Sequence, residues 1–175
     1  MSASSVVQRV ERLGIAVAAS LAFLPGLLTR LLMGEAFFLT GRGKLEHFDN
    51  TVQFFSSLGI PMPELNAAFV SRLEFYGGIA LVLGLATRFV AAGLASTMVV
   101  ALLTADRPSF LDALRLSGEQ TPTDIVPAVY LLFLLWLVIT GPGALSLDRV
   151  IVRWWRREQP AEQGMPAAEG EPVRV

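Results

Sequence analysis

The chain has 175 residues, of which 53% are hydrophobic and only 17% are charged, and its formal net charge is -1. A mean hydropathy of +0.56 is too high for a soluble domain of ordinary composition. The small net charge also excludes the basic stripe that a nucleic-acid partner requires. With no cysteine and His47 as its single histidine, the chain has no ligand set for a thiolate or multi-histidine metal site, a cysteine-ligated iron–sulfur cluster or a bis-histidine haem.

The first apolar stretch follows a polar segment, residues 1–12, which we expect on the cytoplasmic side. Its start, at 13–24, resembles the hydrophobic part of a signal peptide, but no small-residue cleavage site follows and the apolar run continues. At ~1.5 Å of rise per residue, the stretch 13–41 is longer than one membrane crossing needs and too short for two. We therefore predict one long transmembrane helix, tilted or kinked at Pro25.

A loop over about 41–64 comes next, in which Phe54, Phe55 and other apolar residues mix with polar ones. This mixture predicts a short amphipathic piece that lies on the membrane surface. Two further apolar stretches, 65–85 and 89–105, are separated by only three residues and predict a tight antiparallel hairpin of two spans. Small residues four apart favour close approach of these two helices, at Ala80 and Gly84, Ala91 and Ala95, and Ala92 and Ser96.

A fourth span is predicted over 125–140, because Gly141-Pro142-Gly143 stops a helix there. The transmembrane domain then covers 13–145 and contains four helices, so the fold class is an all-α integral membrane bundle. Residues 146–157 are basic and carry two tryptophans, which suits the headgroup layer. The Pro-, Glu-, Ala- and Gly-rich tail over 158–175 is expected to be disordered and cytoplasmic.

The lysines and arginines near the spans fix the expected orientation. If both termini are cytoplasmic, the inner side receives seven of these residues and the outer side four: Arg9, Arg12, Arg88, Arg149, Arg153, Arg156 and Arg157 against Arg42, Lys44, Arg107 and Arg115. By the positive-inside rule, we expect a multi-pass protein of the bacterial inner membrane with both termini in the cytoplasm.

Four ionisable residues fall inside the first two predicted spans, where an unpaired charge facing lipid is costly. They are Arg30 and Glu35 in the first span and Arg72 and Glu74 in the second. Depths counted from the expected outer boundary predict two pairs across the helices, Glu35 with Arg72 and Arg30 with Glu74. Such pairs either do no more than fix how the helices dock, or line a polar pocket for the head of a lipophilic ligand.

A pocket of this kind would be lined by seven candidate residues: Arg30, Glu35, Lys44, His47, Arg72, Glu74 and Tyr76. His47 is the only side chain whose ordinary titration lies near neutral pH, and with the nearby Lys44 it would suit proton exchange with a quinone. The alternative is that His47 is an interfacial polar residue and that Lys44 only extends its amine to the headgroups.

Three motifs in order resemble the DoxX family of small bacterial membrane proteins. They are Arg-Leu-Leu-Met-Gly at 30–34 leading to Gly-Arg-Gly-Lys-Leu at 41–45, Phe-Ser-Ser-Leu-Gly-Ile-Pro-Met-Pro at 55–63, and Glu-Phe-Tyr-Gly-Gly at 74–78 followed by Gly-Leu-Ala-Thr-Arg at 84–88. The resemblance implies a four-helix inner-membrane bundle associated with membrane oxidoreductase assemblies, including thiosulfate–quinone chemistry. It also implies a binding role for the polar patch at 72–78.

Three functions follow from these features. The first is a membrane subunit of a redox complex that binds quinone and receives electrons from partner redox proteins, and that is not active as an enzyme alone. The second is a non-enzymatic anchor or scaffold for partner proteins. The third is a small-solute transporter, which is weaker because four spans without an inverted repeat would require a homo-oligomer.

Overall fold

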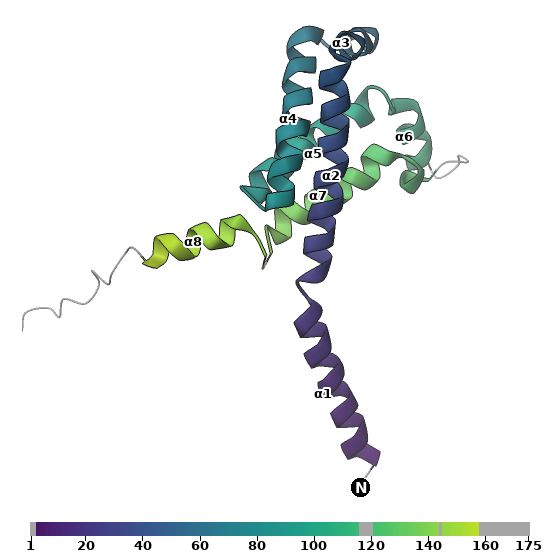
Figure 1. The fold of residues 1–175 in the computed structure, drawn as a ribbon. Coiled ribbons are helices and arrows are strands. Elements are labelled where there is room, and N and C mark those ends of the chain that lie inside the picture. The colour runs from purple at the N-terminus through teal and green to yellow at the C-terminus, as the bar shows by residue number, and fades with distance from the viewer. Residues whose placement is uncertain (1–2, 116–120, 144, 158–175) are drawn as a thin grey trace, which may run out of the picture.

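The computed structural model describes residues 3–115, 121–143 and 145–157, and all regular elements in these ranges are helical (Figure 1). The prediction of an all-α fold is therefore confirmed. In chain order the elements are α1 (Ala3–Leu21), α2 (Leu24–Glu46), α3 (Phe48–Ser57), α4 (Pro63–Leu83), α5 (Thr87–Leu103), α6 (Arg107–Leu114), the 3-10 turn η1 (Pro122–Asp124), α7 (Val126–Thr140) and α8 (Leu147–Arg157). The predicted disordered tail lies outside the described residues.

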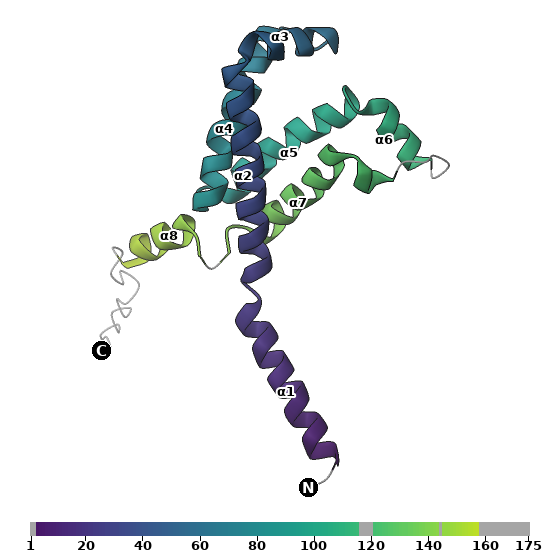
Figure 2. The same cartoon turned by 45° about the vertical axis from the view of Figure 1, so that its right-hand side comes forward.

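The long first helix is interrupted at Ala22 and Phe23, immediately before Pro25. Proline is tolerated in the first turn of α2, because an amide there has no partner within the helix, but it would break a helix interior. The predicted kink at Pro25 is thus confirmed, whereas the predicted boundaries are too narrow, since helix extends from α1 through Glu46. The α1 rod projects away from the other helices, and its residues 11–21 are all exposed (Figures 1 and 2).

Helices α2 and α4 lie antiparallel and in close contact (Figure 2). Glycines make the approach possible: a Cβ on Gly78 would lie 2.6 Å from the carbonyl oxygen of Gly34 and against the backbone of Phe38. A Cβ on Gly41 would likewise collide with the backbone of Phe75. Small residues let membrane helices pack backbone to backbone. These contacts fix the register of α2 against α4.

The second antiparallel pair is formed by α5 and α7, which run obliquely to α2 and α4 (Figures 1 and 2). Its core contains Leu94, Leu134 and Leu137, all fully buried. Ala91 and Ala95 are buried as expected, but Ala92 and Ser96 are exposed. The predicted tight turn between α4 and α5 is confirmed, although α4 makes its closest helix contact with α2 and not with α5.

Four shorter elements lie at the ends of these pairs. Helix α3 is the predicted amphipathic piece and crosses the end of α2 and α4 (Figure 1). The predicted loop after α5 contains α6, bent by 86° from α5, and η1. Within η1, the amide and hydroxyl of Thr121 donate to Asp124 and hold the pKa of that carboxyl below its ordinary value. The basic segment forms α8, which starts beside the C-terminal end of α4, away from α3, and extends sideways (Figure 1).

Length and composition identify one stretch that is sufficient to cross a membrane, Glu11–Glu46, among the residues described. A second is obtained if α5 and the bent α6 count as one broken span. Helix α4 has 21 residues but carries Arg72 and Glu74, which lower its hydropathy, and α7 has only 15. The helices predicted as spans are thus present.

The glycine contact predicts that Gly78→Ala destabilises the fold by about 1–3 kcal/mol, because the new methyl meets backbone that cannot rotate away. The matched control is Gly43→Ala in α2, where an added methyl meets no atom within 4 Å. We expect Gly43→Ala to be neutral or to stabilise by up to about 1 kcal/mol. Denaturation in detergent measures both, and equal stability of the two variants would contradict the register described here.

Candidate functional site

A buried ion pair joins α2 to α4. The Nζ of Lys44 donates to both carboxylate oxygens of Glu74, at 2.5 Å and 2.7 Å. Glu74 is only 1% exposed, whereas the side chain of Lys44 is 32% exposed. A carboxylate held in this way has lost its water and depends on its ammonium partner. The pair is therefore a permanent polar feature in an apolar setting.

The position of this pair follows from how α2 ends. Because α2 continues to Glu46, Lys44 lies in its last turn, three residues beyond Gly41. Gly41 contacts the backbone of Glu74 and Phe75, so the two helices are closest at this level. A lysine stem that starts one turn beyond the contact can reach back along α4 to the carboxylate. A glycine contact and a long flexible side chain together produce the pair.

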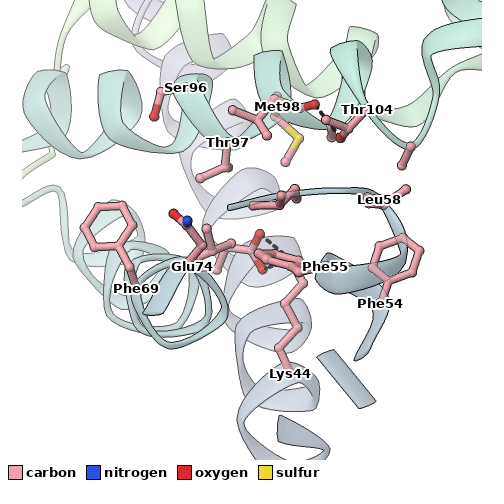
Figure 3. A pocket seen from close by; sticks show the side chains of 16 residues that line it. Lys44, Phe54, Phe55, Leu58, Phe69, Glu74, Ser96, Thr97, Met98 and Thr104 are labelled. Carbon is pink, nitrogen blue, oxygen red and sulfur yellow. Dashed lines mark hydrogen bonds and ion pairs between the residues drawn. The ribbon is translucent and has the colours of Figure 1, made fainter. Parts of the chain in front are cut away.

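A cavity of about 210 Å³ opens beside the pair, between α2, α3, α4 and α5 (Figure 3). Figure 3 shows Phe69 on one side of Glu74 and Phe54 and Phe55 on the other. Most of the wall is apolar, with hydroxyl groups from α5. The residues that line it are Lys44, Phe54, Phe55, Leu58, Ile60, Asn66, Phe69, Val70, Glu74, Ser96, Thr97, Met98, Val100, Ala101, Thr104 and Ala105. The cavity thus combines an apolar chamber with one charged end.

The two predicted ion pairs, Glu35 with Arg72 and Arg30 with Glu74, are wrong. Glu35 and Arg72 are both exposed, and Nη1 of Arg72 donates to the carbonyl of Ala68 in its own helix, at 3.0 Å. Glu74 pairs with Lys44 instead. Of the four side chains, only Arg30 and Glu74 are buried.

Arg30 lies toward the opposite end of α2 and is 3% exposed; two of its guanidinium nitrogens donate to carbonyl groups, whereas its buried Nε has no hydrogen-bond partner among the residues described. Its Nη1 and Nη2 donate to the carbonyls of Pro142 and Leu145, each at 2.5 Å. The guanidinium of Arg30 faces Gly84 at the C-terminal end of α4, where a Cβ would lie 2.5 Å from Nη1. The prediction failed because it aligned helix boundaries by depth, whereas glycine contacts set a register that brings Arg30 to the far end of α4.

Two of the seven predicted site residues, Lys44 and Glu74, line the cavity. His47 is exposed at the junction of α2 and α3, and Tyr76 is 63% exposed on α4. Neither residue lines the cavity. The wall that α5 contributes to the cavity was not predicted. Thr97, Ala101 and Thr104 recur at i, i+4 and i+7, which places them on one helix face. That spacing was the available signal, but nothing in the sequence indicated that this face meets Glu74.

The chain is similar to known proteins over most of its length. A family model described as DoxX matches residues 26–107. "Putative oxidoreductase CatD" of Bacillus subtilis (strain 168) is 30% identical over 127 residues, which are 73% of this chain and 87% of that protein. The chain belongs to the DoxX family. No solved structure matches it significantly.

Two other relatives carry names that state a location. "Inner membrane protein YqjF" of Escherichia coli (strain K12) is 34% identical over 137 residues, covering 74% of this chain and 93% of that protein. "Inner membrane protein YphA" of the same organism is 34% identical over 129 residues, covering 70% and 87%. Both of these relatives are thus named as inner membrane proteins.

The DoxX match contains every residue that lines the cavity, from Lys44 to Ala105. It contains α2, α3, α4 and α5 almost entirely and excludes α1, α7 and α8. The ion pair and its chamber are thus built wholly from the part of the chain that the family model describes. The projecting α1 and the basic α8 are additions to that unit.

The unequal burial of the two partners predicts unequal effects of removing them. Lys44→Met leaves a buried carboxylate without a partner and should cost about 3 kcal/mol or more. Glu74→Gln leaves an ammonium that reaches water, and should cost about 1–2 kcal/mol. The double variant should lose less than the sum of the two, because neither charge is then stranded. Denaturation in detergent checks this cycle, and strictly additive losses would show that the pair does not interact.

Proposed function

We propose that the chain crosses the inner membrane four times, through α2, α4, α5 and α7, with both termini in the cytoplasm. The 21 residues of α4 span ~31 Å, close to the ~30 Å of hydrocarbon. Helices α3 and α8 lie crosswise at the two ends of this length, as interfacial helices do (Figure 1). The shorter α5 and α7 require the bilayer to thin around them, which costs little per ångström.

Within this bundle we propose a binding site for the head group of a quinone, as part of a redox-linked membrane complex. The observation that carries the proposal is the buried Lys44–Glu74 pair at the polar end of an otherwise apolar cavity. Ligand sites are mostly apolar chambers with a few placed polar groups. At about 210 Å³, the cavity has room for the ring of a quinone but not for its isoprenoid tail, which would extend between helices into the lipid.

The chemistry of the pair suits a quinone. The ammonium of Lys44 has hydrogens to donate to a quinone carbonyl oxygen, and the carboxylate of Glu74 accepts a proton and can return it when the ring is reduced. The chain has no cysteine and one histidine, so the electrons must come from a partner protein. The relative named "Putative oxidoreductase CatD" supports a redox association.

The proposal predicts saturable binding of a short-chain quinone analogue to the purified protein. Glu74→Gln should weaken it by about tenfold or more, because the ammonium of Lys44 loses the carboxylate that holds it at the cavity. Glu35→Gln removes the same charge from an exposed position of the same bundle and should leave binding unchanged. Quenching of protein fluorescence by the analogue measures the affinity.

A second variant separates loss of binding from loss of folding. Ala101→Trp fills the chamber from the α5 wall without touching the ion pair, and should abolish binding while the protein elutes normally from a sizing column. If Ala101→Trp and Glu74→Gln both bind the analogue as well as the unaltered protein does, the quinone site does not exist.

A second candidate function, an anchor for partner proteins, is favoured by α1. This helix carries exposed Leu13, Ile15, Val17 and Leu21 and projects away from the other helices (Figure 2). Such an apolar surface requires cover by another protein or by lipid. An anchor without a quinone site would retain its co-purifying partners in Ala101→Trp and lose them when residues 3–21 are deleted.

A further inference from the structure

Helix α8 has a sharply two-sided distribution of side chains. Leu147, Val150, Ile151 and Trp154 recur at i, i+3, i+4 and i+7 and form one apolar stripe. Trp154 and Trp155 are 58% and 68% exposed, so this stripe is not covered by the rest of the chain. Arg149 and Arg153 lie on the opposite face. This pattern is typical of a helix that lies in the headgroup layer of a membrane.

The arginine face also borders a groove. Thr140, Pro142 and Gly143, at the end of α7, form one wall around a volume of about 360 Å³. The other wall is formed by α8, through Asp148, Arg149, Val152 and Arg153. Both arginines are exposed. Two guanidinium groups one helical turn apart, with an apolar side chain between them, suit a phosphate group attached to an aliphatic chain.

Asp148, the only acid of α8, is already engaged elsewhere. Its carboxylate oxygens accept hydrogen bonds from the amides of Ala86 and Thr87, at 2.7 Å and 3.1 Å, where α5 begins. Its own amide donates to the carbonyl of Gly84, at 3.1 Å. These bonds fix the rotation of α8 about its axis and hold the carboxylate of Asp148 at the first turn of α5. The arginines of the groove are left to attract an anion from outside.

We propose that the groove between the end of α7 and α8 binds the headgroup of an anionic phospholipid in the cytoplasmic leaflet. Its phosphate lies between Arg149 and Arg153, and its acyl chains pack beside the tryptophans of α8. The assignment of the leaflet rests on the membrane orientation proposed above. The choice of lipid rests on charge complementarity at the groove and on the apolar stripe on the other side of α8, since a soluble anion would use only the first.

The test uses the full-length protein in neutral detergent, with Trp136→Phe so that Trp154 and Trp155 report alone. Short-chain phosphatidylglycerol should shift their emission in a saturable titration, and short-chain phosphatidylcholine and inorganic phosphate should not. Arg149→Gln with Arg153→Gln should weaken the affinity for phosphatidylglycerol about 30-fold, from roughly fivefold for each arginine near an anionic lipid. The matched control, Arg107→Gln with Arg115→Gln, removes two arginines from the opposite end and should have no effect.

Salt provides a readout that needs no variant. Raising sodium chloride from about 0.05 M to about 0.5 M should weaken binding of phosphatidylglycerol, because exposed charges are then screened. Equal response to both lipids, or to inorganic phosphate alone, overturns the headgroup site, as does unchanged affinity in the double glutamine variant. Quinone binding in that variant should be normal, so failure of this site and failure of the quinone site are separable.

Discussion

The glycine contact between α2 and α4 determines where every interior charge of the molecule lies. Because Gly34, Gly41 and Gly78 let the two backbones touch, the helices cannot slide past each other without creating a clash or a void. One register therefore brings Lys44 to Glu74 at one end and Arg30 to Gly84 at the other. A larger side chain at the contact would separate the helices and enlarge the cavity between them.

The sequence predicted the helices well and their partners poorly. Apolar blocks, prolines and the mixture of apolar and polar residues around Phe54 are local signals, so α4, α5 and α7 were found within a few residues and the amphipathic α3 was anticipated. The first helix was placed too narrowly, and α6 was predicted as loop. Register depends on which glycines meet, and a membrane span offers several candidates. The pairs at Ala80 and Ala91 pointed to α4 with α5, whereas the glycines of α2, which lie outside that predicted hairpin, make the closest contact.

The failure of the predicted ion pairs has a second cause, which is the nature of the partners. Matching charge to charge assumed that a buried cation needs an anion, yet Arg30 is held by two backbone carbonyls from the loop after α7. Inside a membrane an unsatisfied hydrogen-bond donor is costly with or without an opposite charge. Every residue carries a carbonyl, so the sequence cannot show which ones will lie near an arginine. The pairing of Glu74 was unpredictable for the related reason that α2 was expected to end before Lys44.

The two ends of the α2–α4 contact place different groups in the two halves of the membrane. Under the proposed orientation, Lys44, Glu74 and the cavity lie in the outer half, whereas Arg30, Asp148 and α8 lie at the cytoplasmic surface. A protein that reduces a quinone in this cavity would then reach it from the outer side or through the lipid, and a partner held by α1 would meet the opposite face. One rigid register fixes both ends of this contact. A change in how α8 meets the membrane can therefore reach the cavity only by moving α4 against α2. The glycines make this contact the one least able to slide.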